Sequence, residues 1–317
     1  AGIFAINGKI SVGNIISFNK FSNHFGRPIN EIANQFNVIQ SGLAGAERMF
    51  NIMDEEEEYP DNDGKPSLTQ VRGHVEFRNV SFGYDENKLV IKNFNLEANP
   101  GETIALVGPT GAGKTTIINL LTRFYDVTEG EILIDGKNIK DLDKYSLRDA
   151  LGIVLQDTVM FSETVKENIR YGKLEATDEE IKEASKLANA HQFIKRLPEG
   201  YDTLLAEDGG NISVGQRQLL NISRVILNDP DILILDEATS NVDTRTELHV
   251  QDAMNKLLEG RTSFVIAHRL STIHNADKIV VINHGEIVEQ GNHDDLIKNK
   301  GMYYTMYTGM FDNVEEE

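Results

Sequence analysis

The chain has 317 residues, of which 31 are Lys or Arg, 50 are Asp or Glu and none is Cys. The formal net charge of −19 argues against non-specific nucleic-acid binding, because such binding needs a basic surface that displaces counterions from phosphate. The lack of cysteine excludes a disulfide framework, a thiolate zinc site and a cysteine nucleophile. The length is enough for about two domains.

Residues 1–53 differ in composition from the rest, with six of the 14 Phe and no Tyr. No uncharged apolar run reaches the ~20 residues of a membrane-spanning helix. The apolar positions that recur at a helical spacing are Ile32, Phe36, Ile39 and Leu43. We expect Pro28 to start or kink this helix. The pattern alone leaves two interpretations open: an amphipathic helix packed on a soluble domain, or a membrane helix that lines a polar pathway.

Two short acidic blocks hold much of the charge excess. Residues 54–63 contain seven carboxylates and no base, and residues 312–317 contain four more. Runs of like charge repel one another and stay solvated, so we expect a linker and a tail. Because the sequence begins at Ala1 in mid-pattern, without Met, we expect it to be a fragment of a longer protein.

The pattern changes after Val71. Alternating apolar positions predict a first strand from Val75 to Phe82 and a second at 89–96. Pro100 and Gly101 then interrupt the pattern. A short apolar strand is predicted at 104–107, and a helix follows over 116–121.

A glycine-rich phosphate-binding loop is predicted between this strand and this helix. The residues that match GxxxxGK[ST] are Gly108, Pro109, Thr110, Gly111, Ala112, Gly113, Lys114 and Thr115, and Thr116 follows them. Glycine lets backbone N–H groups surround phosphate oxygens, and the helix N-terminus adds its positive dipole end. We expect Lys114 to contact the β- and γ-phosphates of a nucleotide and the Thr115 hydroxyl to bind Mg²⁺.

Acidic and imidazole side chains follow two further apolar segments. Ile232–Leu235 has the composition of a buried parallel strand and ends in Asp236 and Glu237. Together with the phosphate loop, this predicts Asp236 as a holder of Mg²⁺ and Glu237 as the group that faces an attacking water. His268 follows the apolar segment 263–267, and ligand groups gather at the carboxyl edge of such sheets. His268 is therefore a candidate γ-phosphate contact.

The stretch NISVGQRQ at 211–218 resembles the LSGGQ signature of the nucleotide-binding domain of ABC transporters, with Ile212 in place of Leu. The resemblance implies that Ser213, Gly215 and Gln216 contact the ATP held by an opposite subunit. It therefore implies a head-to-tail dimer that encloses two ATP molecules, formed with an identical or a different half-subunit.

Other positions are similar to further motifs of this family. The resemblance implies that Tyr84 stacks on adenine, and that Gln156 contacts Mg²⁺ and senses the transport domain. It implies that Asp243 lies in the loop that crosses the dimer interface, and that His268 is the family's switch histidine. Residues 203–209 resemble an exporter-type loop that touches the membrane domain through Glu207, with Ala206 replacing the usual Gly.

The first segment also resembles this family. Arg27, Pro28, Gln40 and residues 46–50 look like the end of an exporter half-subunit's last membrane helix. The resemblance favours the membrane interpretation of residues 1–53, followed by a linker at 54–70. The nucleotide-binding domain is then 71–317, with a helical part at about 141–215. The implied fold is an α/β P-loop NTPase with an antiparallel β subdomain and a helical signature subdomain, preceded by a long helix.

We therefore expect ATP hydrolysis, with Mg²⁺, to power export of a drug-like molecule or a lipid. The implied partners are a second half-subunit and a transmembrane domain, with no nucleic acid. The implied location is the cell (inner) membrane, with the nucleotide domain on the cytoplasmic side. The alternatives are a soluble ABC-type ATPase acting on nucleic acid or ribosomes, an importer ATPase subunit, and a regulatory module that binds nucleotide without turnover.

Overall fold

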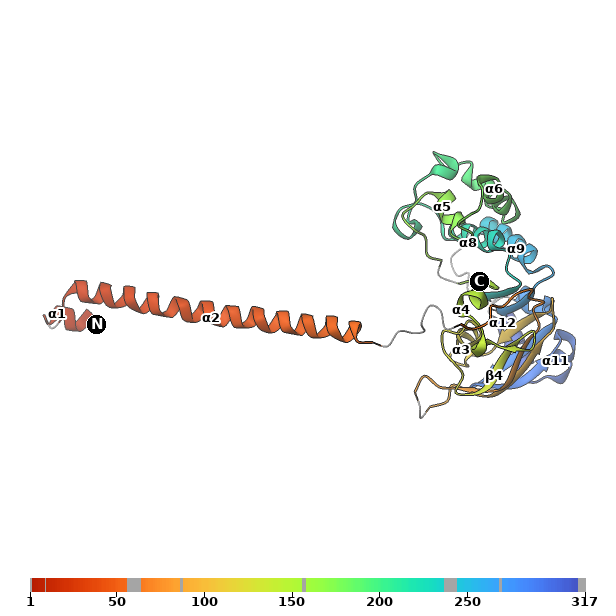
Figure 1. Cartoon of the computed structure of the whole chain (residues 1–317), viewed down its shortest axis with the longest axis horizontal. Helices are drawn as coiled ribbons and strands as arrows, with labels where there is room; N and C mark the ends of the chain where they lie inside the picture. The colour runs from red at the N-terminus through yellow and green to blue at the C-terminus, as the bar shows by residue number, and fades with distance from the viewer. Residues whose placement is uncertain are drawn as a thin grey trace. The chain divides into compact units, whose positions relative to one another are not determined.

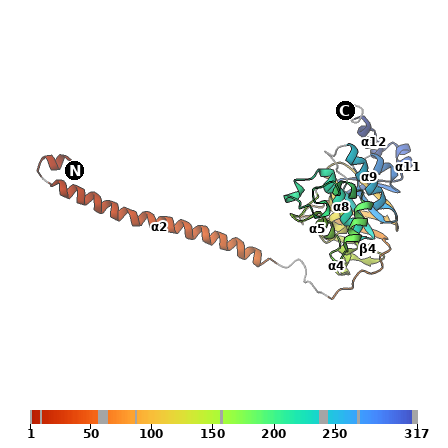
Figure 2. The ribbon, with the colours of Figure 1, turned by 90° about the horizontal axis from the view of Figure 1, so that it is seen from above.

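The computed structural model describes residues 2–8, 10–55, 64–85, 88–155, 158–236, 244–267 and 270–312. It divides into two units, Ala1–Asp63 and Gly64–Glu317, which Figures 1 and 2 show from two directions.

The first unit consists of α1 (Gly2–Ile6) and α2 (Val12–Met53). Ser11 caps α2, because its side chain accepts a hydrogen bond from the Asn14 backbone N–H at 3.1 Å. The prediction that Pro28 starts the helix was wrong, because this cap sets the start at Val12 and leaves Pro28 inside the helix. No residue of α2 is buried. None of the helices in the described ranges combines the length and the apolar character that a membrane span needs.

The second unit contains an antiparallel sheet of four strands in the order β2-β1-β4-β5. Its strands are β1 (Val75–Phe82), β2 (Ile91–Ala98), β4 (Glu129–Ile134) and β5 (Lys137–Asn138). Phe77 of β1 lies opposite Leu96 on one side and Ile132 on the other. Its ring packs edge to face on Phe94 and Phe264, at centroid distances of 5.4 and 6.2 Å. The two sheets thus share one apolar core.

The other sheet has six strands in the order β10-β9-β3-β8-β7-β6. These strands are β3 (Thr103–Val107), β6 (Leu151–Val154), β7 (Ile232–Asp236), β8 (Thr262–Ile266), β9 (Lys278–Asn283) and β10 (Glu286–Gly291). All neighbours pair in parallel except β10, which is antiparallel to β9. Leu235 lies opposite Val154 and Val265, and Leu106 lies opposite Ile266. The carboxyl ends of β6, β7, β8 and β3 are therefore level.

Helices surround the second sheet. They are α3 (Lys114–Leu121), α4 (Lys144–Asp149), α5 (Val165–Arg170), α6 (Asp178–Leu187), α7 (His191–Ile194), α8 (Val214–Asn228), α9 (Thr244–Leu258), α10 (Leu270–Asn275), α11 (His293–Asn299) and α12 (Met302–Asp312). Short 3₁₀ turns lie at Ile139–Asp141, Gly200–Asp202 and Glu207–Gly209. The helices α5, α6, α8 and α9 gather on one side of this unit (Figure 1). The predicted α/β class with an antiparallel sheet and a long first helix is confirmed.

Candidate nucleotide-binding site

The loop 108–113 runs from the end of β3 to the start of α3. Gly108 has φ +154°, and a Cβ there would lie 2.2 Å from the Ile282 carbonyl oxygen of β9. Gly113 has φ +111°, and a Cβ there would lie 2.6 Å from Ile91 Cδ1. Only glycine fits these two positions, because the backbone conformation and the close neighbours both exclude a side chain. The loop therefore packs closely against both sheets, on Ile282 of one and Ile91 of the other.

Hydrogen bonds hold the loop in a closed curve. The Ala112 N–H donates to the Pro109 carbonyl at 3.1 Å, and the Gly285 N–H, in the β9–β10 turn, donates to the Ala112 carbonyl at 3.0 Å. Gly113 caps α3 with no side-chain hydrogen bond. The first N–H groups of α3 therefore lack a side-chain partner at the cap and can bind an anion.

Lys114 lies inside this curve. Its Nζ donates to the Gly108 carbonyl at 2.7 Å and to the Pro109 carbonyl at 3.1 Å. Burial lowers the pKa of Lys114 below its usual value, while the nearby Asp236 carboxylate opposes that shift. The loop lysine and the acid at the end of β7 are thus close enough to interact, as expected from the level strand ends.

Thr115 and Thr116 have different surroundings in the first turn of α3. Thr115 is exposed, whereas Thr116 is buried and its hydroxyl lies 3.2 Å from the Tyr84 hydroxyl. Thr115 is therefore the hydroxyl open to a metal ion, and the Thr116 side chain serves to position Tyr84.

Tyr84 belongs to an aromatic cluster beside the loop. Its ring packs edge to face against Phe82 and Tyr125, both at centroid distances of 5.0 Å, and 49% of the residue stays exposed. An exposed ring face held in this way can stack on a base. Tyr125 was not predicted from the sequence, although the aromatic pair Phe124–Tyr125 shortly after α3 was a visible signal.

Four of the predicted site residues lie outside the described residues: Gln156, Glu237, Asp243 and His268. Three of them follow the level strand ends closely in the chain, Gln156 after β6, Glu237 after β7 and His268 after β8. Their roles stay predictions.

The signature residues lie at the start of α8. Ser213 caps this helix: its hydroxyl oxygen accepts from the Gln216 N–H at 3.2 Å, and the Gln216 side chain accepts from the Ser213 N–H at 2.9 Å. This reciprocal capping box satisfies two backbone donors. It leaves the hydroxyl proton of Ser213 and the amide N–H₂ of Gln216 as donors for a ligand. Gly215, the second residue of α8, is buried.

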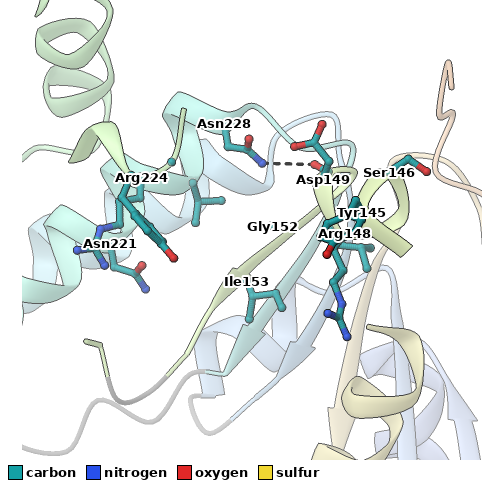
Figure 3. A pocket seen from close by; sticks show the side chains of 13 residues that line it. Tyr145, Ser146, Arg148, Asp149, Gly152, Ile153, Asn221, Arg224 and Asn228 are labelled. Atoms are coloured by element: carbon teal, nitrogen blue, oxygen red, sulfur yellow. Dashed lines mark hydrogen bonds between the residues drawn. The ribbon is translucent and has the colours of Figure 1, made fainter. Parts of the chain in front are cut away.

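A cavity of about 610 Å³ lies between α4 and β6 on one side and α8 and the turn after α5 on the other. Figure 3 shows Tyr145, Arg148 and Ile153 on one wall, and Asn221 and Arg224 of α8 on the other. Asn228 Nδ2 donates to the Asp149 carbonyl across the end of the cavity at 3.4 Å. This cavity could not be predicted from the sequence, because its walls are far apart in the chain.

Residues 91–240 match the family model described as ABC transporter. The chain is 53% identical over 311 residues to the uncharacterized ABC transporter ATP-binding protein YfiC of Bacillus subtilis, covering 98% of this chain and 52% of that protein. It is 50% identical over 305 residues to a fatty acid ABC transporter ATP-binding/permease protein of Mycobacterium bovis, covering 96% of this chain and 48% of that protein.

The chain belongs to the ABC transporter family. A solved structure of a bacterial Atm1-family ABC exporter with ATP bound is 41% identical, with a TM-score of 0.78, over 95% of this chain and 53% of that one. The predicted family, fold and ATPase class are confirmed. The alternatives of a soluble ATPase acting on nucleic acid or ribosomes, and of an importer subunit, receive no support from these matches.

The ABC transporter chain spans about half the length of the curated relatives it matches. Family membership accounts for the loop at 108–115 and for the capped start of α8, because both lie within the matched residues. It does not assign a transported molecule.

Proposed function

We propose that this chain binds ATP with Mg²⁺ and hydrolyses it to power export of a lipid or a drug-like molecule through a membrane. One observation carries the proposal. The phosphate loop, which ends in Lys114 and Thr115, lies at the carboxyl ends of the parallel strands. The Asp236 carboxylate lies at the same ends, close enough to Lys114 to interact with it. That edge is where parallel α/β sheets bind ligands.

The donor set suits Mg²⁺. The described residues contain no group of three or more His, Asp or Glu side chains that could hold a metal. Mg²⁺ bound to a nucleotide needs no such group, since one or two carboxylates, the phosphates and water supply most of its ligands. The Thr115 hydroxyl and the Asp236 carboxylate would hold it, with Gln156 as a third ligand. When bound, the ion neutralises charge on the phosphates.

In this proposal the protein's own groups divide the remaining work. Lys114 and the N–H groups of 108–116 bind the phosphates, and Tyr84 stacks on adenine. Glu237 orients the attacking water and accepts its proton, and His268 contacts the γ-phosphate. Such positioning and charge stabilisation are the main contributions to phosphoryl transfer.

The proposed partner is a second half-subunit, identical or different, in a head-to-tail dimer. The donors that Ser213 and Gln216 leave available point to a ligand that this chain does not itself supply. Asp243 would lie at the interface. The cavity in Figure 3 suits a transmembrane domain as its occupant, because it lies between β6, the last strand at one side of the sheet, and the signature helix α8.

The proposed location follows from the same assembly. Residues 1–53 would form the end of the transmembrane domain, 54–70 the linker and 71–317 the nucleotide-binding domain on the cytoplasmic side of the cell (inner) membrane. A lipid is favoured among the transported molecules, since one relative is a fatty acid ABC transporter protein.

Substitution of Glu237 tests the ATPase assignment. Glu237→Gln removes the proposed base and keeps the shape, so hydrolysis by the full-length protein should fall roughly 10²–10⁴-fold while ATP still binds. Phosphate release and ATP binding measure the two effects. Lys114→Ala should instead abolish both, and wild-type turnover in Glu237→Gln would refute the assignment. A wild-type protein that binds ATP without hydrolysing it would identify a regulatory module.

A further inference from the structure

Arg224 is a buried arginine about three turns from the start of the signature helix α8. Only 9% of the residue is exposed. Its guanidinium donates to the Val159 carbonyl at 2.8 Å, to the Asn168 side-chain oxygen at 2.7 Å and to the Asn168 backbone carbonyl. Within the described ranges no carboxylate pairs with it. Burial accordingly lowers the pKa of Arg224, although an arginine remains a cation at neutral pH.

Asn168 continues this contact into the segment before α5. It is fully buried, and its Nδ2 donates to the carbonyls of Phe161, Glu163 and Thr164 at 3.0 to 3.2 Å. Its Oδ1 accepts from the Phe161 N–H at 2.9 Å as well as from Arg224. The side chains of Arg224 and Asn168 thus fasten the segment 159–164 to α8. We call this pair the Arg224–Asn168 clamp.

The same segment also holds the start of the loop that leads to the signature. The Val165 N–H donates to the Thr203 carbonyl, and the Leu205 N–H donates to the Glu163 carbonyl, both at 3.0 Å. The residues before loop 206–213 are therefore bonded to residues 163–165, and the helix after it, α8, is bonded to residues 159–168. Asn211 braces the loop between these points, with bonds to the Ala206 N–H and the Leu204 carbonyl. One segment is thus bonded both to the chain before the loop that carries Ser213 and to the helix after it.

We propose that Arg224 is a positioning residue which, through Asn168, sets the place of Ser213 relative to the chain that follows Gln156. Arg224 also lines the cavity. A ligand or protein segment in the cavity would therefore move segment 159–168, loop 206–213 and the start of α8 together. This inference rests on the proposed function, since Ser213 matters only if it contacts ATP.

Lysine cannot replace Arg224 in this place. The guanidinium makes its bonds in a fixed planar fork and lies 5.6 and 5.9 Å from the ring centroids of Phe161 and Tyr171. A lysine ammonium keeps the charge but is a single point with rotatable donors. Arg224→Lys should therefore loosen the clamp and leave the charge in place.

Hydrogen exchange and ATPase kinetics of the full-length protein test the proposal. In the wild type, ATP should slow exchange in 159–168 and at the start of α8 together. In Arg224→Lys, ATP should still slow hydrogen exchange at the start of α8 but should no longer slow it in 159–168. The kcat should fall about tenfold, within the range by which coupling residues act, while the KM for ATP changes less than about twofold. Asn168→Ser, which weakens the clamp from its other end, should reproduce both effects.

Arg170→Lys is the matched control, because Arg170 lies on α5 and pairs with the carboxylates of Glu167 and Asp178 at the surface. It should leave the linked protection intact. Joint protection of 159–168 and α8 in Arg224→Lys, or a kcat equal to that of Arg170→Lys, would overturn the proposal. A wild-type protein that does not hydrolyse ATP would instead refute the proposed function. If Arg224→Lys does not fold, Asn168→Ser alone decides between these outcomes.

Discussion

Lys114 combines burial with a charge that the site requires. Its Nζ is bonded to two carbonyls of its own loop, and burial makes its cation less favourable than in water. The sequence predicted its identity and its role from the motif alone. The motifs also placed Asp236 beside the phosphate loop, through the shared Mg²⁺. The sequence could not predict the strand order, in which β8 lies between β3 and β7 and the strands end level.

The lowered pKa of Lys114 predicts weaker ATP binding at alkaline pH. Phosphate needs the charged lysine, and this charge is lost at a pH below the usual 10.5. The affinity should therefore fall as pH rises through the lowered pKa. The free energy of unfolding depends on pH with the opposite sign at this residue. Between the lowered pKa of the folded state and the usual pKa, the unfolded chain binds more protons than the folded chain, so stability rises with pH. Equilibrium binding of ATP to Glu237→Gln between pH 7.5 and 10 measures the effect, and Lys114→Arg should remove most of it. A pH-independent affinity in the parent would contradict the prediction.

Gln218 of α8 is a second residue whose surroundings predict a measurable effect. Only 3% of it is exposed, and its Oε1 has no hydrogen-bond partner among the described residues. An unsatisfied buried polar group costs about 1–3 kcal/mol. Gln218→Met keeps the length and removes the acceptor, so the free energy of unfolding should rise by about 1 kcal/mol. Thermal unfolding measures this, with the exposed Gln192→Met as the control. Equal or lower stability of Gln218→Met would contradict the prediction.

At the scale of single elements, local patterns predicted well where one rule dominates. The strands predicted at 104–107 and 232–235 occur at 103–107 and 232–236, because continuous apolar runs suit a sheet covered on both faces. The start of α2 was missed because the Ser11 cap, seventeen residues before Pro28, sets it. The clamp could not be predicted, since Asn168 and Arg224 meet only after α5 packs on α8.

The start of α8 uses Ser213 for two purposes that a substitution can separate. Asp is as good a helix cap as Ser, so Ser213→Asp should keep the thermal stability within about 1 kcal/mol. Its negative charge would face the phosphate of the opposite subunit's ATP, so hydrolysis should fall at least about tenfold. Ser213→Ala should lose about 1 kcal/mol of stability as the cap is lost. Thermal unfolding and phosphate release separate the two effects, and an active Ser213→Asp protein would exclude Ser213 from contact with ATP.

At the scale of the whole molecule, the second unit supplies only part of each site that we propose. The phosphate loop and Asp236 lie at the edge of the second sheet, whereas Ser213 lies at the start of a helix in the group that includes α5 and α6 (Figure 1). The sequence predicted the phosphate loop and Asp236 from their motifs, and it predicted the role of Ser213 by resemblance to the family. How they combine depends on a second subunit, because a head-to-tail dimer would place each loop opposite the partner's signature.

Pairs of defective subunits test this arrangement. A dimer of one Lys114→Ala subunit and one Ser213→Asp subunit has one site with both defects and one site with none. Co-expressed full-length subunits carrying different tags, purified through both tags, should therefore regain about half of the wild-type ATPase activity. In each site, Lys114 and Glu237 come from the same subunit. A dimer of one Lys114→Ala subunit and one Glu237→Gln subunit therefore has one defect in each site and should stay inactive. Recovery in both pairs, or in neither, would contradict the head-to-tail arrangement with independently active sites.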